Sequence, residues 1–205
     1  MTRNLLAMIF LLCSTQAISL EKLPSEYLIK YGDSEASTEV IEYFSLSCKD
    51  CLRCFVEDFK SIQKEFIDTK KVSWAFHPNP ADLLTLQAMV CLERLEEKEK
   101  ILFLETVIEI LYEQELSGIK EDNPDPLLVM KLTMQALGKP ILNLDELDQI
   151  KATKAYSSAR FYLKQPDFVR DIPTVEINGK IYDEFPNKKF LKNRLEKHLQ
   201  PRNPV

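Results

Sequence analysis

Cysteine is the residue type whose spacing in this chain points most directly to chemistry. Residues 47–51 read Ser-Cys-Lys-Asp-Cys, so that Cys48 and Cys51 are separated by two residues, and Cys54 repeats this spacing. A Cys-x-x-Cys pair can exchange disulfides, bind zinc or hold an iron–sulfur cluster. The spacing alone leaves two interpretations open: a redox pair formed by Cys48 and Cys51, or a metal site formed by Cys48, Cys51 and Cys54.

The residues around the pair predict how it is positioned. Residues 39–46 are rich in β-branched and aromatic side chains and predict a buried strand that ends just before Cys48, while residues 52–67 carry aromatic side chains at helical spacing. The first turn of a helix offers unpaired N–H groups and the positive end of the macrodipole, which favour a thiolate. We therefore expect Cys48 to be an exposed nucleophile with a lowered pKa, and Cys51, one turn further, to resolve the mixed disulfide.

The rest of the chain predicts an α/β unit interrupted by helices. Apolar periodicity, β-branched residues and Gly/Pro breaks define the elements, and Asn178-Gly179 between two apolar runs predicts a hairpin. The expected strands are 27–31, 39–46, 72–76, 174–177 and 180–182, and the expected helices are 52–67, 83–95, 101–116, 127–137, 144–163 and 190–199. The order indicates one domain over residues 18–205 with a helical insertion at about 78–168.

Two motifs far apart in the sequence resemble a known family. The run Glu-Tyr-Phe-Ser-Leu-Ser-Cys-x-x-Cys ends at Cys51, and the run Ile-Pro-Thr-Val-Glu-Ile-Asn-Gly-Lys begins at Ile172. A proline that opens a strand can be cis. Together these motifs resemble the DsbA-like thiol–disulfide oxidoreductases of the thioredoxin superfamily. The resemblance implies a thioredoxin fold with a helical insertion, a redox pair that needs no cofactor, and a substrate chain that pairs with the backbone beside Ile172 and Pro173.

Glu42 is the third candidate site residue. Strand alternation places it on one face with Val40 and Phe44, where a carboxylate is costly unless it has a partner or a function. Glu42 lies six residues before Cys48, at the position where thioredoxin-like proteins carry a buried acid. The resemblance implies a proton relay to Cys51, and the alternative is a solvated glutamate at the strand edge.

The two residues inside the motif predict the redox strength. Lys49 should favour the Cys48 thiolate and Asp50 should oppose it, so that their effects partly cancel. The motif contains no histidine or proline, which strongly oxidising DsbA proteins tend to have, and Ile172 before Pro173 resembles reducing thioredoxins. We expect a weaker oxidant than DsbA at about −120 mV, with the oxidase, isomerase or reductase direction left open.

The remaining cysteines and the two histidines suggest structure more than chemistry. Cys54 and Cys91 lie on apolar helix faces and are expected to be buried free thiols, with a Cys54–Cys91 disulfide as the alternative. His77 follows a strand, and we expect a structural or surface residue. His198 lies in the last helix and is expected to be solvated.

The first residues have the layout of a secretory signal peptide. Arg3 precedes an uninterrupted apolar run at 5–12, and small and polar residues lead to a cleavage point after Ala17. The apolar run is short for a membrane span of about 20 residues, which makes an uncleaved anchor the weaker alternative. Residues 1–17 therefore predict a periplasmic or other extracytoplasmic location, exported clients and a membrane redox partner. The segment before the first strand is short and shows no dimerisation extension, so we expect a monomer.

Composition narrows the function classes further. The net charge of −5 and the pI near 5.3 give no reason to expect nucleic acid as a partner. The chain has only 4 glycines and no Gly-rich phosphate-binding motif, while 45% hydrophobic residues are enough for a core. Besides the redox and metal interpretations, this composition also fits a folding chaperone in which the cysteines matter little.

Overall fold

The computed structural model describes residues 22–117, 125–141 and 147–200. Its centre is a five-stranded sheet in the order β1-β3-β2-β4-β5. The strands are β1 (Ile29–Tyr31), β2 (Thr38–Phe44), β3 (Val72–Pro78), β4 (Thr174–Ile177) and β5 (Lys180–Tyr182). β2 and β3 are parallel and the other neighbours are antiparallel, so that the ends of β2 and β3 meet at one edge of the sheet. The expected mixed α/β architecture is confirmed.

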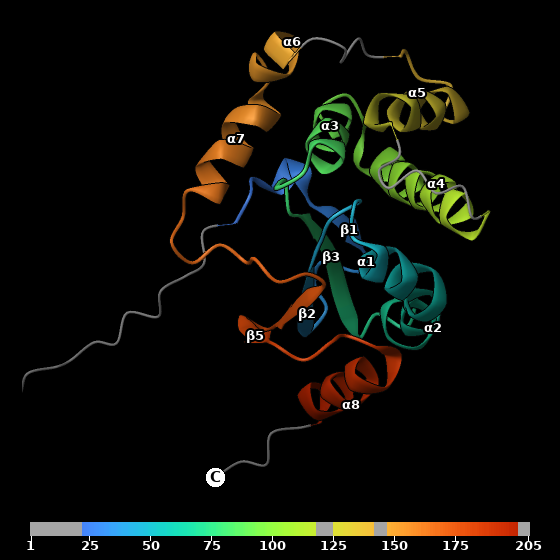
Figure 1. The fold of residues 1–205 in the computed structure, drawn as a ribbon. Coiled ribbons are helices and arrows are strands. Elements are labelled where there is room, and N and C mark those ends of the chain that lie inside the picture. Colours follow the sequence, from blue (N-terminus) through green and yellow to red (C-terminus); the bar gives the residue numbers. More distant parts are fainter. Residues whose placement is uncertain (1–21, 118–124, 142–146, 201–205) are drawn as a thin grey trace, which may run out of the picture.

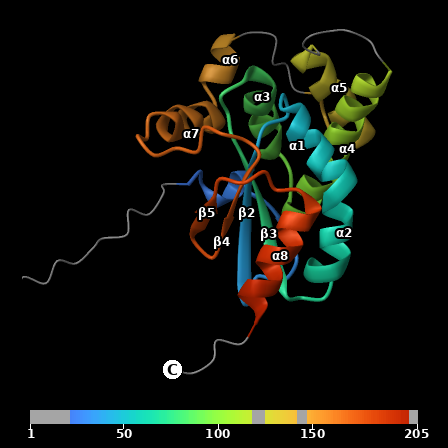
Figure 2. The same cartoon turned by 60° about the horizontal axis from the view of Figure 1, so that its bottom comes forward.

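One long helical rod connects β2 to β3 and begins inside the Cys-x-x-Cys motif. It consists of α1 (Lys49–Arg53), a π-helical stretch η2 (Cys54–Phe59), α2 (Lys60–Ile62) and a second π-helical stretch η3 (Gln63–Ile67). The rod begins three residues before the predicted helix, because the Cys48 side chain caps it by accepting a hydrogen bond from the Cys51 N–H. Figure 2 shows α8 (Lys188–Leu199) running beside this rod on one side of the sheet.

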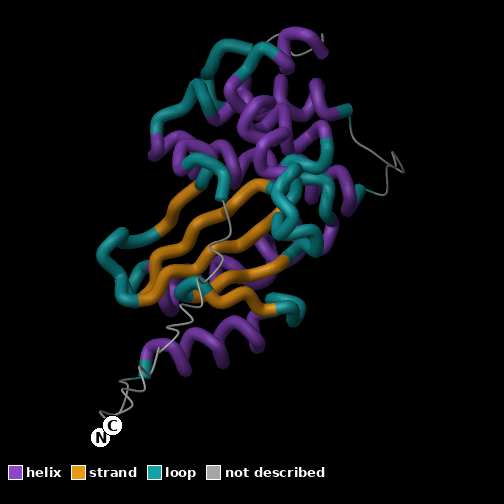
Figure 3. The backbone as a smooth tube through the Cα atoms, turned by 90° about the vertical axis from the view of Figure 1, so that its left-hand side faces the viewer, coloured by secondary structure: helices purple, strands orange, loops and turns teal. Residues whose placement is uncertain are grey.

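The other helices lie between β3 and β4 in sequence and gather beyond the end of the sheet. They are α3 (Leu83–Leu92), α4 (Glu97–Leu116), α5 (Pro126–Ala136), α6 (Leu147–Lys151) and α7 (Lys154–Leu163). Figures 1 and 3 show them as a cap at the top of the molecule, with α8 at the opposite end. This cap is the predicted helical insertion. Within the described residues, no helix is long and apolar enough to cross a membrane.

Three local predictions were wrong. Residues 25–27 form a short 3-10 helix, η1 (Ser25–Tyr27), so β1 begins at Ile29 rather than at residue 27. The single helix expected at 144–163 is two helices, because Thr153 accepts a hydrogen bond from the Tyr156 N–H and starts α7 afresh; residues 144–146 lie outside the described residues. His198 is half-buried, with its Nε2 2.9 Å from the Tyr182 hydroxyl, and is not a solvated residue.

Other sequence predictions were confirmed. The hairpin between β4 and β5 turns through Asn178 and Gly179, whose φ angles of 48° and 80° fit a type I′ turn. His77 is fully buried, and its Nε2 accepts a hydrogen bond from the Leu23 N–H at 3.0 Å. Burial lowers the pKa of His77 to about 4, which makes it a neutral structural residue.

Candidate redox site

Cys48 lies at the end of the short loop that connects β2 to the long helical rod. It is half-buried, and its Sγ accepts a hydrogen bond from the Cys51 N–H at 3.2 Å. Cys51 is only 3% exposed and sits one turn into the helix. Both cysteines are free thiols in this structure. One thiol is therefore accessible and the other is shielded behind it, as the sequence predicted.

The two thiols differ in acidity for reasons visible in this geometry. Hydrogen bonds from Cys51, followed by the backbone of Asp50, lower the pKa of Cys48 from 9.0 to about 7, against burial and the Asp50 charge. The pKa of Cys51 is raised far above its usual range, mainly by its hydrogen bond to Cys48 and by burial. At neutral pH, Cys48 is therefore about half thiolate, while Cys51 keeps its proton.

The chain returns to Cys48 from the far end of the sequence. The Ile172–Pro173 peptide bond is cis, and the Cys48 Sγ lies 3.8 Å from the Ile172 carbonyl oxygen. Pro173 directly precedes β4, which pairs with β2 in the sheet. The sheet thus brings together the two segments that the sequence analysis singled out separately, 124 residues apart.

Glu42 is buried in the middle of β2 and is only 4% exposed. It lies between Phe76 of β3 and Val175 of β4 in the sheet register. Burial, against the opposing effect of the Trp74 side chain and together with the Cys48 charge, raises the pKa of Glu42 to about 8. The alternative of a solvated glutamate at a strand edge is wrong, because Glu42 belongs to a central strand with a neighbour on either side.

The charges inside the motif are exposed and paired. The Lys49 ammonium lies 3.6 Å from the Glu115 carboxylate at the end of α4, and Arg53 pairs with Asp50 at 2.7 Å. The Asp50 charge raises the pKa of Cys48, as predicted from its sign. The pairing of Lys49 with the insertion was not predictable from local sequence, because Glu115 is 66 residues away.

Cys54 and Cys91 are buried and free, as predicted. Burial raises the pKa of each thiol to about 12, and they form no disulfide with one another. Across the described ranges, no three His, Cys, Asp or Glu side chains are grouped so that they would hold a metal ion. The geometry therefore gives no support to a metal site formed by Cys48, Cys51 and Cys54.

Asp82 is a site residue that the sequence analysis missed. It caps α3 and also accepts hydrogen bonds from the side chains of Ser45 and Ser47, which precede the redox pair. Asp82 three residues before Thr85 is a visible helix-cap signal, but nothing in the sequence indicates that the same carboxylate reaches the 45–47 loop.

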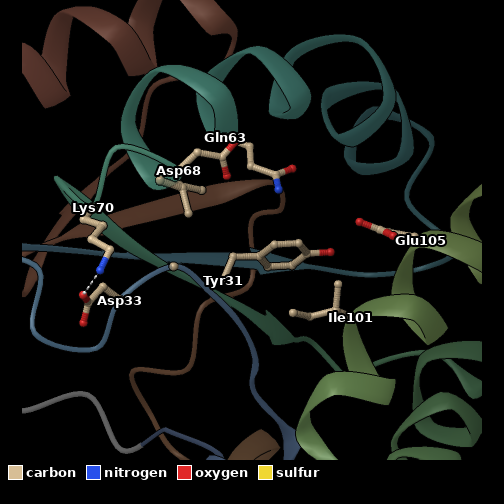
Figure 4. A pocket seen from close by; sticks show the side chains of 9 residues that line it. Tyr31, Asp33, Gln63, Asp68, Lys70, Ile101 and Glu105 are labelled. Carbon is tan, nitrogen blue, oxygen red and sulfur yellow. Dashed lines mark ion pairs between the residues drawn. The ribbon is translucent and has the colours of Figure 1, made fainter.

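A hollow of about 500 Å³ lies away from the redox pair, at the end of the sheet where β1 stops and β3 begins. Figure 4 shows Tyr31 and Glu105 facing each other in it, with the Asp33–Lys70 ion pair at one side. It is lined by no cysteine. This hollow is therefore separate from the thiol chemistry.

Comparisons with known proteins identify the family and the fold. A family model described as thioredoxin matches residues 25–197. No curated protein matches the chain. Solved structures that resemble it include Wolbachia pipientis alpha-DsbA1, with a TM-score of 0.65 and 20% identity over 86% of this chain and 93% of that one. A protein-disulfide isomerase from Novosphingobium aromaticivorans has a TM-score of 0.64 and 13% identity, over 85% of this chain and 98% of that one.

A third similar structure is MdbA, a thiol-disulfide oxidoreductase from Actinomyces oris, with a TM-score of 0.60 and 16% identity over 87% of this chain and 92% of that one. At such identities the likeness concerns the fold, and the insertion between β3 and β4 is part of it. The family model spans most of the chain, so the protein belongs to the thioredoxin family and has its DsbA-like fold with a helical insertion.

Proposed function

We propose that the protein is a thiol–disulfide oxidoreductase that uses Cys48 as the nucleophile and Cys51 as the resolving thiol. The observation that carries the proposal is the asymmetry of the pair: the accessible Cys48 has a pKa near 7, while Cys51 behind it keeps its proton. An exposed thiol of lowered pKa beside a shielded second thiol is the arrangement that disulfide exchange requires.

The reaction proceeds in two exchanges. The Cys48 thiolate attacks one sulfur of a substrate disulfide, a Cys48–substrate disulfide forms, and the other substrate sulfur leaves as a thiolate. Cys51 then loses its proton and attacks the Cys48 Sγ, which releases the second substrate thiol and forms the Cys48–Cys51 disulfide. The substrate gains two electrons and the protein loses two. Run backwards, the same steps oxidise a client dithiol.

Glu42 is the proposed proton acceptor for the second step. Cys51 has to lose a proton inside the protein, and the charge of Glu42 is felt at Cys51, where it raises the pKa of the thiol. With a pKa near 8, Glu42 can take up and release a proton close to neutral pH. Glu42→Gln should slow the release of the mixed disulfide while leaving the first attack by Cys48 unchanged.

Ile172 and Pro173 are the proposed contact for the substrate backbone. The Ile172 carbonyl already lies beside the Cys48 sulfur, so an extended peptide whose disulfide is under attack by Cys48 would run along this segment. Backbone pairing of this kind accepts clients of many sequences, since it does not read side chains.

Lys49 and Asp50 are the proposed determinants of redox strength. Asp50 raises the pKa of Cys48, and the ammonium of Lys49 is held by Glu115, so neither residue strongly favours the thiolate. A less stabilised thiolate makes a weaker oxidant. We propose a reduction potential more negative than the about −120 mV of DsbA.

The proposed cellular location of the protein rests on residues 1–17, which lie outside the described residues. As a signal peptide cleaved after Ala17, they would deliver a monomer to the periplasm or another extracytoplasmic space, where its clients are exported proteins and a membrane protein renews its redox state. N-terminal sequencing of the protein recovered from its native cell checks the cleavage; a chain that still begins at Met1 contradicts it.

The activity is tested with a model peptide that carries two cysteines. Oxidised protein is mixed with the reduced peptide, and peptide disulfide and protein thiols are counted by mass spectrometry. We expect one peptide disulfide for every two protein thiols formed, and none with Cys48→Ser. Equal peptide oxidation by both proteins would overturn the proposal, and a potential at or above about −120 mV would overturn the predicted redox strength.

A further inference from the structure

The carboxylate of Asp82 joins the helical insertion to the loop that precedes the redox pair. Its Oδ2 accepts a hydrogen bond from the Ser45 hydroxyl at 2.6 Å, and its Oδ1 accepts one from the Ser47 hydroxyl at 2.8 Å. The same two oxygens accept hydrogen bonds at 2.8 Å from the hydroxyl and the N–H of Thr85 in the first turn of α3. One side chain therefore holds both the loop and the helix start.

Further bonds tighten the same junction. The Thr85 hydroxyl oxygen accepts a hydrogen bond from the Leu46 N–H at 3.0 Å, and the Ser45 hydroxyl oxygen accepts one from the Ser47 N–H at 3.0 Å. Ser45, Leu46 and Thr85 are all buried. Hydrogen bonds to an ionised acceptor in such surroundings are stronger than those between neutral groups. The loop 45–47 is thus fixed at each of its three residues.

Ser45 in turn contacts both redox cysteines through its backbone. Its carbonyl accepts a hydrogen bond from the Cys48 N–H at 3.2 Å. A backbone hydrogen bond from Ser45 also acts on the Cys51 thiol, where it lowers the pKa against the effect of burial. One residue, Ser45, therefore links Asp82 to the backbone of Cys48 and to the thiol of Cys51.

The caps of two other helices bond only to residues close by in the sequence. Thr153 accepts a hydrogen bond from the Tyr156 N–H at the start of α7 and donates one to the Ile150 carbonyl of α6, and Asn187 accepts one from the Phe190 N–H at the start of α8. Asp82 instead reaches hydroxyl groups 35 and 37 residues away. The additional bonds of Asp82 to the 45–47 loop are thus more than capping of α3 requires.

We propose that Asp82 is a positioning residue for the redox pair, which holds Ser45 and Ser47 from the helical insertion and so fixes the turn that presents Cys48. The inference rests on the proposed function of the pair. It also gives the insertion a role in the chemistry, since α3 supplies the group that orders the loop before the nucleophile.

Because Asp82 is charged, the direction in which the pKa of Cys48 changes on substitution tests the proposal. A negative charge disfavours a neighbouring thiolate, so removing the Asp82 charge, taken alone, would not raise the pKa of Cys48. Loss of the ordered loop acts in the opposite direction, because the thiolate loses hydrogen bonds that depend on the turn. A helix cap without any other role would change the free energy of unfolding and leave the thiol unaffected.

The test compares Asp82→Asn with Ser45→Ala and with the cap control Asn187→Ala. Asparagine caps helices about as well as aspartate, and its amide nitrogen cannot accept the Ser45 hydroxyl hydrogen. The Cys48 thiolate is titrated by its absorbance at 240 nm. We expect the thiolate fraction at pH 7 to fall about threefold in Asp82→Asn and in Ser45→Ala, and to stay unchanged in Asn187→Ala.

In the double variant of Asp82→Asn and Ser45→Ala, the thiolate fraction at pH 7 should fall no further than in the more affected single variant, because both substitutions remove the same contact. A rise in the thiolate fraction of Asp82→Asn, or no change in either variant, would overturn the proposal. If Asp82→Asn does not fold, Ser45→Ala decides alone. The titration needs no client, so it separates failure of this inference from failure of the proposed function, which would show as wild-type protein that cannot oxidise the peptide.

Discussion

The helical rod after β2 contains two cysteines one turn apart, Cys51 and Cys54, whose surroundings differ. Cys51 shares a hydrogen bond with Cys48, whereas Cys54 is buried without such a partner thiol, and burial raises its pKa to about 12. Cys91 of α3 resembles Cys54 in burial and acidity. We infer from this difference that a position at the start of the helix, rather than the Cys-x-x-Cys spacing, decides which thiols react.

The sharpest way to break this comparison is to remove one thiol of each kind. Cys48→Ser should lower the rate of disulfide exchange at least about a thousandfold, because the attacking sulfur is lost. Cys54→Ala is the matched control and should keep the wild-type rate, at a cost in unfolding free energy of about 1 kcal/mol. Both rates are measured with the two-cysteine peptide. Comparable losses in the two variants would contradict the distinction between the thiols.

The second prediction concerns the division of labour within the redox pair. Cys51→Ser leaves the attack by Cys48 intact and removes the resolving thiol, so the mixed disulfide should accumulate to about one per protein chain. Non-reducing gels and intact mass detect this adduct. Cys91→Ala serves as the control and should accumulate none. Rapid release of the peptide from Cys51→Ser would show that another thiol resolves the adduct.

The third prediction concerns Glu42 and pH. Its pKa rises from 4.5 in the unfolded chain to about 8 when buried, so between these values the folded state binds more protons than the unfolded state. Stability from this group is therefore complete below about pH 4.5 and is lost as the pH rises through 8. At pH 9, Glu42→Gln should be more stable than the wild type by on the order of a few kcal/mol.

Urea unfolding at pH 5 and pH 9 measures this difference, and Glu39→Gln is the matched control because Glu39 lies on the same strand but is exposed. The control should follow the wild type at both values. If Glu42→Gln loses as much stability between pH 5 and pH 9 as the wild type does, Glu42 is not a buried acid with a raised pKa.

Much of this comparison was predictable from the sequence. The β-branched run before Cys48, the aromatic spacing after it and the Asn178-Gly179 turn depend on local chemistry, and each predicted element was found. The position of Pro173 at a strand start allowed a cis peptide bond and the resemblance to DsbA-like proteins implied one, and the bond is cis. The split at Thr153 was missed because one side-chain hydrogen bond outweighed an apolar periodicity that continued through it.

Long-range polar contacts were not predictable. Lys49 pairs with Glu115 and Asp82 binds Ser45, and in both cases the partner is set by how the insertion docks against the sheet. Nothing in a single sequence marks which of its many carboxylates will meet a given hydroxyl or ammonium group. The candidate thiols could therefore be named in advance, while the residues that hold them in place required the structure.

The smallest predicted effect separates the two residues between the redox cysteines. Asp50→Asn removes a charge that raises the pKa of Cys48 and should increase the thiolate fraction at pH 6 by about twofold. Lys49→Gln should change it less, since the ammonium is paired with Glu115. Absorbance at 240 nm against pH reports both, and an equal or larger shift from Lys49→Gln would show that the pairing does not shield Cys48.

The central claim is that Cys48 and Cys51, and not Cys54 or Cys91, form the reversible disulfide. Equilibration of the protein with glutathione redox buffers, followed by alkylation and peptide mass mapping, tests it directly. We expect a single Cys48–Cys51 disulfide whose amount follows a two-electron equilibrium, with Cys54 and Cys91 alkylated as thiols throughout. A Cys51–Cys54 or Cys54–Cys91 disulfide, or no reversible disulfide at all, would contradict it.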